Sequence, residues 1–174
     1  IHERGMPRYR MADRFWGREV KLIIPMSRAI ADAMVAQGVS PANIRVIYDG
    51  VDPRRLRATR SPGELRAEWN ITPDQPLVGM VGNVREWKGQ ETVVRALSGV
   101  VQRFPDLVCL FVGSASQVDA PYMERLQSII RANGLDANVR FTGYQRDVPS
   151  IVNAMLFTIH ASIAPEPFGM VILE

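Results

Sequence analysis

The sequence predicts an α/β fold: a Rossmann-like, doubly wound parallel sheet with helices on both faces. Short apolar, β-branched runs alternate with segments of helical periodicity along the 174 residues. The runs are almost continuously apolar, which is typical of strands in a sheet that is covered on both faces. Alternation of strands with helices favours right-handed crossovers between parallel strands.

Six apolar runs are predicted to be strands because they are short, rich in branched side chains and bounded by turn-forming or polar residues. They are Lys21–Pro25, Arg45–Tyr48, Leu77–Val81, Val108–Val112, Val139–Thr142 and Leu156–His160.

Helices are predicted between these strands. The segment Gln90–Phe104 carries an apolar stripe at helical spacing that is expected to face the sheet. Pro121–Asn133 has a similar stripe and is followed by Gly134, a suitable residue for the left-handed turn after a helix. Ser61 precedes Glu64 by three residues, which predicts a capping box at the start of a further helix. The stripe of the first helix comprises Val93, Val94, Leu97, Val100, Val101 and Phe104.

Composition indicates a globular chain, with 47% hydrophobic and 22% charged residues. No apolar run approaches the ~20 residues of a membrane-spanning helix. The single cysteine, Cys109, excludes an internal disulfide, and its apolar surroundings favour a core position. A cytoplasmic location is expected, with peripheral membrane association of the parent protein as a further expectation.

Arginine accounts for most of the net charge of +3 and is concentrated in Arg4–Arg18 and Arg54–Arg60. Solvated surface around a linker is the favoured interpretation, and attraction to an anionic acceptor or membrane is the alternative. No nucleic-acid motif occurs, so no nucleic-acid partner is expected.

The turn-rich stretch Asp49–Pro53 predicts a domain boundary. Residues 1–52 are too few for a complete α/β domain, so they are interpreted as the end of a neighbouring domain with a linker. Residues 53–174 are interpreted as the main domain. The chain ends on the apolar run Met170–Leu173 and Glu174, which suggests that this domain is truncated at its C-terminal end.

Ligands of open parallel sheets collect beyond the carboxyl ends of the strands. The loop Gly82–Gln90 follows a predicted strand, and in it Arg85 and Lys88 provide positive charge for a phosphate. It matches neither a Walker loop nor the Gly-x-Gly-x-x-Gly pattern. A simple helix start at Lys88-Gly89 explains the spacing equally well.

Three other loops follow strands. Gly113–Ser116 is a weak signal, since glycine after a strand is common. In Phe141–Pro149, Tyr144 is either a stacking partner for a base or an exposed side chain. In Ala164–Glu174, a predicted helix begins at Met170 and directs its free N–H groups to the ligand zone.

Metal ligands are scarce. The sequence contains no Asp-x-Asp, and His2 and His160 are isolated from any cluster of carboxylates or cysteines. A catalytic metal is therefore not expected, and no cofactor is predicted.

In three of its segments the chain resembles retaining glycosyltransferases of the GT-B fold, the large family that includes glycogen synthase and sucrose synthase. "VGNVREWKGQ" is similar to the family's Gly-Arg-Leu-x-x-x-Lys-Gly loop, and "IHASIAPEPFGMVILE" to its signature of two glutamates separated by seven residues. "PMSRAIADAMVAQGVSPANIRVIYDGVD" resembles the end of the N-terminal domain and the linker. The resemblance implies that 1–52 is a remnant of the acceptor domain and that 53–174 is the domain that binds a nucleotide-sugar donor.

The resemblance also implies roles for individual residues. Lys88 binds the donor diphosphate, Glu166 lies by the donor sugar, and Glu174 binds the ribose hydroxyls. Asn83 stands where the family usually has arginine, and Arg85 is the candidate to compensate. The remaining expected donor contacts are Gly82, the base-side residues Gly143 and Tyr144, and the backbone amides of Phe168, Gly169 and Met170.

The implied function is metal-independent transfer of a sugar from a nucleotide-diphosphate sugar, with retention, in polysaccharide or glycolipid biosynthesis. The acceptor, a glycan or lipid-linked glycan, is expected to contact the missing N-terminal domain, so the fragment itself is expected to be inactive. A sugar-nucleotide epimerase of the same fold and a non-catalytic nucleotide- or partner-binding module remain as alternatives. Base, sugar and acceptor are left open.

Overall fold

The computed structural model describes residues 2–3 and 20–173. The chain divides into two compact units. The first consists of the described residues up to Asp52 together with Pro165–Leu173, and the second is Pro53–Ala164. The final helical segment, which the sequence analysis includes in 53–174, thus packs with the first unit. Glu174 and the arginine group Arg4–Arg18 lie outside the described residues.

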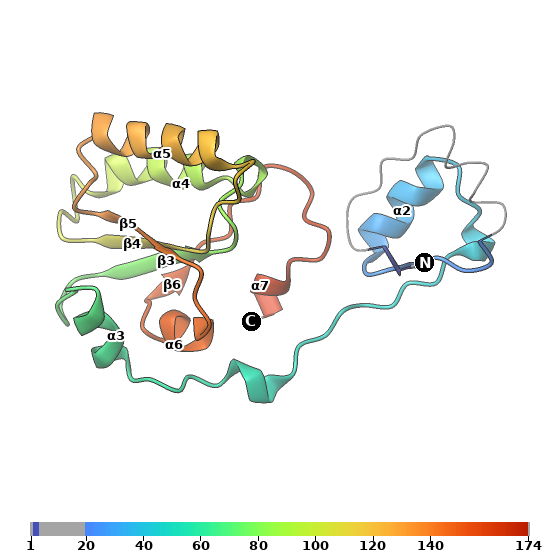
Figure 1. Ribbon diagram of the computed structural model, residues 1–174, viewed down its shortest axis with the longest axis horizontal. Coiled ribbons are helices and arrows are strands. Elements are labelled where there is room, and N and C mark those ends of the chain that lie inside the picture. Colours follow the sequence, from blue (N-terminus) through green and yellow to red (C-terminus); the bar gives the residue numbers. More distant parts are fainter. Residues whose placement is uncertain (1, 4–19, 174) are drawn as a thin grey trace. The chain divides into compact units, whose positions relative to one another are not determined.

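The second unit is built on a four-stranded parallel sheet (Figure 1). Its strands are β3 (Leu77–Val81), β4 (Val108–Val112), β5 (Val139–Gly143) and β6 (Phe157–Thr158). The spatial order is β5-β4-β3-β6, and all three neighbouring pairs are parallel. The predicted parallel sheet is confirmed, and β3 and β4 have the predicted bounds.

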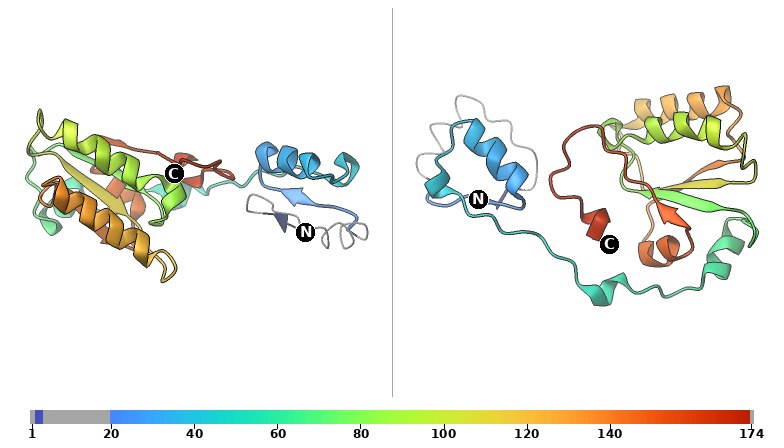
Figure 2. Two further views of the ribbon diagram at one scale, coloured as in Figure 1. Left: turned by 90° about the horizontal axis from the view of Figure 1, so that it is seen from above. Right: turned by 180° about the vertical axis from the view of Figure 1, so that it is seen from behind.

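Helices cover both faces of this sheet. On one face lie α4 (Gln90–Val100) and α5 (Ala120–Ala132), and on the other lie α3 (Pro62–Glu68) and α6 (Val148–Asn153) (Figures 1 and 2). The predicted doubly wound α/β class is therefore confirmed. No helix in the described part of the chain is long and apolar enough to cross a membrane.

Strand β4 explains why the strand sequences are apolar without alternation. Val108, Leu110 and Val112 belong to the core cluster with α3 and α6, whereas Cys109 and Phe111 belong to the cluster with α4 and α5. Successive side chains of a strand point to opposite faces, so a strand that is covered twice must be apolar at every position. Burial also raises the pKa of the Cys109 thiol to about 12, as suits a core residue.

The helix ends follow local chemistry. Ser61 caps α3 and forms the predicted capping box with Glu64, and Gly134 adopts φ 65° after α5. Helix α4 is shorter than predicted, because Phe104 precedes Pro105 and a residue before proline avoids the helical region. Phe104 is 48% exposed, so the apolar stripe that faces the sheet does not extend to this residue.

The first unit has a smaller apolar core. It contains a short parallel pair, β1 (His2–Glu3) and β2 (Ile24–Pro25), and the helix α2 (Arg28–Ala36). The core cluster comprises Ile23, Met26, Ile30 and Met34. The remaining short helices of the chain are η1 (Pro41–Asn43), η2 (Pro53–Leu56), η3 (Glu86–Lys88) and α7 (Met170–Leu173).

One predicted strand is not formed. The segment Arg45–Tyr48 contains no strand, although the N–H groups of Arg45 and Ile47 donate to the carbonyls of Ile23 and Pro25. Ile47 and Tyr48 are 50% and 58% exposed. Residues with this exposure gain little from burial, so β-branched composition alone did not suffice to predict the strand.

Ser150 ties the start of the second unit to α6. It is 0% exposed, and its Oγ accepts hydrogen bonds from the N–H groups of Thr59 at 2.8 Å and Arg60 at 3.0 Å. We expect Ser150→Ala to lower the free energy of unfolding by about 2 kcal/mol, because two backbone donors lose their acceptor. Urea denaturation measures this. Ser128→Ala, at an exposed position of α5, is the control, and an equally small loss in both variants would contradict the prediction.

Candidate functional site

Three adjacent strands end at glycines. Gly82 follows β3, Gly113 follows β4 and Gly143 closes β5, with φ values of 144°, 148° and 68°. The N–H of Gly82 donates to Val112 O at 2.9 Å, and that of Gly113 donates to Gly143 O at 3.0 Å. A Cβ on Gly113 would lie 2.2 Å from the carbonyl oxygen of Gly82. The carboxyl edge of the sheet is thus bare backbone, where a ligand can approach closely.

Lys88 lies beside this edge. It is the last residue of η3, and its Cε is 3.9 Å from the position that a Cβ on Gly82 would occupy. Its Nζ is 4.3 Å from the centroid of the Trp87 ring. The loop therefore returns Lys88, the only lysine of the second unit, to the end of β3.

Asn83 and Arg85 have different surroundings. The Asn83 side chain is exposed, while its backbone carbonyl accepts a hydrogen bond from Gln90 Nε2 at 2.9 Å. Arg85 Nε lies 3.4 Å from Asp119 Oδ2, at the start of α5. To substitute for the arginine expected at position 83, Arg85 has to exchange this ion pair for a ligand.

Gly89 joins the loop after β3 to the loop after β6. It adopts φ 79°, and a Cβ there would lie 1.9 Å from the carbonyl oxygen of Ala161. Next to it, the N–H of Ile163 donates to Trp87 O at 2.9 Å. Glycine is required because the two backbones are in contact. This contact also fixes the residue that directly follows Lys88.

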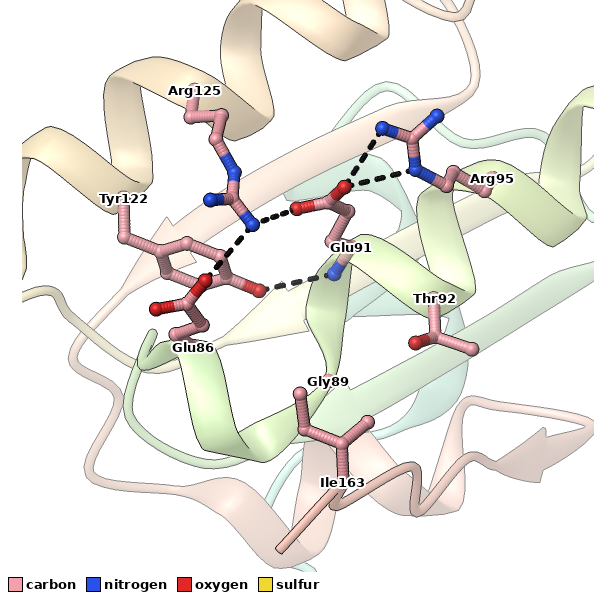
Figure 3. A pocket seen from close by; sticks show the side chains of 8 residues that line it. All are labelled: Glu86, Gly89, Glu91, Thr92, Arg95, Tyr122, Arg125 and Ile163. Carbon is pink, nitrogen blue, oxygen red and sulfur yellow. Dashed lines mark hydrogen bonds and ion pairs between the residues drawn. The ribbon is translucent and has the colours of Figure 1, made fainter.

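The Lys88 loop, Gly82–Gln90, also borders a pocket of about 300 Å³ that is lined by charged side chains of α4, α5 and η3 (Figure 3). Arg125 pairs with Glu91 and also lies 3.0 Å from Glu86, and Glu91 pairs with Arg95 at 2.8 Å. The Tyr122 hydroxyl accepts from the N–H of Glu91 at 3.1 Å. The lining residues are Glu86, Gly89, Glu91, Thr92, Arg95, Tyr122, Arg125 and Ile163. The network attaches η3 to both helices.

The arginines change the titration of Glu91. Hydrogen bonds from Arg125 and then Arg95 hold the pKa of Glu91 below its ordinary value of 4.5. Burial raises the pKa of the Tyr122 hydroxyl. Because the folded pKa of Glu91 is lower than the unfolded one, this carboxylate stabilises the fold fully above pH 4.5, and the stabilisation is lost as the pH falls through the lower folded value.

We therefore expect Glu91→Gln to lose less thermal stability than the wild type when the pH is lowered from about 5 to about 3. The wild type loses the Glu91 ion pairs over this range, whereas the variant never has them. Melting temperatures across the pH series measure the difference. Glu124→Gln, at an exposed position on α5, should keep the wild-type slope, and a Glu91→Gln slope equal to that of the wild type would refute the assignment.

Gly143 and Tyr144, the two residues predicted to contact the base, lie at the end of β5. They are at the glycine edge, the carboxyl edge of the sheet that Gly82, Gly113 and Gly143 form. Gly143 accepts the hydrogen bond from Gly113, and Tyr144 is 75% exposed. Gln145 Nε2 donates to Thr142 O at 3.0 Å and so closes the turn locally. The structure thus brings Gly82, Lys88 and Gly143 to one edge of one sheet.

The predicted donor contacts Glu166, Phe168, Gly169 and Met170 belong to the first unit. The carbonyl of Pro167 accepts from Ser27 Oγ at 2.5 Å, and the Phe168 ring lies 6.1 Å from that of Tyr48. Phe168 also packs against the core cluster that contains Ile30.

The turn between Glu166 and α7 is tight. Gly169 adopts φ 80°, and a Cβ on it would lie 3.4 Å from Glu166 Cγ. Met170 opens α7 as predicted. The roles of Glu166, Phe168, Gly169 and Met170 stay predictions.

Within residues 2–3 and 20–173, no group of three or more His, Cys, Asp or Glu side chains is arranged to hold a metal ion. His160 Nε2 lies 3.5 Å from Ser162 Oγ.

The fold matches that of a class of proteins, the GT-B glycosyltransferases. The structure of Anabaena Alr3699/HepE, solved in complex with UDP and glucose, matches with a TM-score of 0.83 and 30% identity over 92% of this chain and 43% of that chain. A glycosyltransferase from Rickettsia africae matches in fold, with a TM-score of 0.85 and 20% identity over 98% of this chain and 47% of that chain.

Within this class, the chain belongs to the glycosyl transferases group 1 family, whose model matches residues 63–174. A curated relative, the D-inositol 3-phosphate glycosyltransferase of Corynebacterium jeikeium, is 26% identical over 88% of this chain. The match covers 38% of that relative, so the chain spans well under half of its length.

Several residues of this region were not predicted as site residues. Gln90 and Tyr122 were assigned to helices, and Arg125 is 34 positions from Glu91. The spacing of Glu91 and Arg95, four residues apart, is a local signal for their ion pair. No local pattern connects either residue with Tyr122 or Arg125.

Proposed function

We propose that this chain is the donor-binding part of a retaining, metal-independent glycosyltransferase that uses a nucleotide-diphosphate sugar. The observation that carries the proposal is the position of Lys88 beside Gly82, at the backbone-lined edge of the parallel sheet. A cation at this edge suits a diphosphate. Support comes from the Anabaena relative, whose structure was also solved in complex with UDP-glucose.

In the proposed complex, Lys88 neutralises charge that develops on the diphosphate as the glycosidic bond breaks. Gly82 and Gly143 permit close approach of the donor, and Tyr144 stacks on the base. Asn83 and Arg85 complete the diphosphate contacts.

The sugar and ribose contacts are proposed for the segment that follows β6. Glu166 orients the sugar and Glu174 binds the ribose, while the amides of Phe168, Gly169 and Met170 address the sugar and phosphate. The glycosidic bond between the anomeric carbon and the diphosphate breaks, and its electron pair leaves with the diphosphate oxygen. The acceptor hydroxyl oxygen then attacks from the same face of the oxocarbenium-like sugar, which retains the configuration, and its proton passes to the departing diphosphate oxygen.

The acceptor is proposed to be a glycan, a lipid-linked glycan or a small polyol, bound with the help of residues outside this chain. The polyol is included because two curated relatives are named for D-inositol 3-phosphate and for 2-deoxystreptamine. Residues 1–52 are proposed to come from the acceptor domain. The 174 residues alone are then expected to bind the donor without transferring sugar, because catalysis requires both substrates to be held together.

Titration calorimetry of the protein with UDP, GDP and UDP-glucose tests the proposal. Binding of at least one nucleotide, undiminished by a chelator, is expected. Incubation of the full-length protein with donor and acceptor, followed by NMR of the anomeric proton in the product, tests transfer and retention. Absence of nucleotide binding would refute donor recognition, and epimerised sugar from donor alone would favour the epimerase. Binding without transfer or hydrolysis in the full-length protein would favour a non-catalytic module.

A further inference from the structure

Gln90 is a buried polar residue inside an apolar stripe. It is the first residue of α4 and is 1% exposed, and the next inward residues of the helix are Val93, Val94 and Leu97. Full burial of a glutamine is uncommon. An apolar side chain of the same length would fill this place without the cost of desolvating an amide. The amide therefore calls for an explanation other than packing.

The two polar atoms of this amide have unequal surroundings. Nε2 donates to the carbonyl of Asn83 at 2.9 Å. Oε1 is buried and has no hydrogen-bond partner within the described chain. A buried acceptor without a partner destabilises a fold. Exchanging the two amide atoms would place Oε1 against the Asn83 carbonyl, so the observed orientation keeps the one bond that is available.

The Asn83 hydrogen bond closes the Lys88 loop. The loop leaves β3 at Gly82. It is anchored there by the N–H groups of Gly82 and Val84, which donate to the carbonyls of Val112 and Ser114 at 2.9 Å and 3.1 Å. Gln90 stands two residues beyond Lys88. Its bond to Asn83 thus joins the far end of the loop to the peptide between the two anchors, and fixes the separation of Asn83 and Lys88.

We propose that Gln90 is a positioning residue for the diphosphate of the donor, an inference that rests on the proposed function. It does not touch the donor. Its amide holds the Asn83 peptide so that Asn83 and Lys88 face the diphosphate with a fixed spacing. The unpaired Oε1 then lowers the stability of the fold, as polar groups at functional sites often do.

Gln90→Met separates positioning from packing, because methionine has the same length and no hydrogen-bonding amide. We expect a melting temperature equal to or above that of the wild type, since the variant removes an unpaired buried acceptor together with its single bond. The dissociation constant for UDP should rise roughly three- to tenfold, as expected for the loss of one organising hydrogen bond. Gln127→Met, at an exposed position of α5, is the matched control and should change neither quantity.

The outcomes are distinguishable. A wild-type protein that binds no nucleotide overturns the proposed function and this inference together. A wild type that binds UDP and a folded Gln90→Met variant that binds it within twofold of the same affinity overturn the inference alone. NMR of the wild type provides a measurement that is independent of the variant's folding. The Gln90 side-chain amide signals should shift on addition of UDP, and unchanged signals would overturn the inference.

Discussion

Gly89→Ala is expected to lower the free energy of unfolding by about 2–5 kcal/mol, the sum of the cost of a left-handed backbone at a non-glycine residue and the cost of relieving an overlap between two loops. The added Cβ would lie 1.9 Å from the Ala161 carbonyl oxygen, at φ 79°. The two nearest atoms, the carbonyl oxygen and carbon of Ala161, belong to the backbone and not to the end of a flexible side chain, so the two loops must separate. Denaturant unfolding measures the loss, and UDP affinity should fall with it because Lys88 is the adjacent residue.

Gly99→Ala, inside the helix α4 that Gly89 precedes, is the control. A Cβ on Gly99 would meet nothing within 4 Å, and alanine is favoured over glycine inside a helix by about 0.5–1 kcal/mol. This variant should therefore be as stable as the wild type or slightly more so. If Gly89→Ala were tolerated as well as Gly99→Ala, the close approach of the two loops would be wrong.

In the full-length protein, Lys88→Ala is expected to lower the rate of sugar transfer by about 100- to 1,000-fold, the usual effect of removing one group that stabilises developing negative charge. The proposed role is strongest when the diphosphate leaves, so the turnover number should fall more than the donor affinity. Initial rates at saturating acceptor and varied donor separate the two quantities. The fold should survive, because Lys88 is at the surface of the site and only partly buried.

The chain has a convenient control, since Lys21 and Lys88 are its only lysines. Lys21 is exposed in the first unit, and Lys21→Ala should leave donor affinity and transfer unchanged. Equal activity of Lys88→Ala and Lys21→Ala would remove Lys88 from the proposed mechanism. A loss confined to donor affinity would assign it to binding alone.

Local sequence patterns predicted the parts of the fold that local physics determines. The strand bounds of β3 and β4 were correct because a doubly covered strand must be apolar at every position. The cap at Ser61 and the turn at Gly134 were correct because each depends on a residue type at one position. The segment Arg45–Tyr48 was wrong as a strand, because its strand-like composition is not accompanied by burial.

The same distinction applies to the site. Glycines after strands indicate where a ligand can approach the backbone, and Lys88 lies beside one of them, Gly82, while its role stays a prediction. The engagement of Arg85 by Asp119 and the bond between Gln90 and Asn83 could not be predicted. Both depend on the packing of α4 and α5 against the loop. A buried glutamine has no distinctive spacing, so only its three-dimensional surroundings reveal it.

The chain contains one thiol, and it is inert. Cys109 is 0% exposed at the centre of β4, and its pKa of about 12 leaves almost no thiolate at neutral pH. Maleimide is therefore not expected to label the native chain. A single cysteine introduced at Tyr144, which is 75% exposed, would carry a fluorophore at the rim of the glycine edge, without prior removal of the native cysteine from the core.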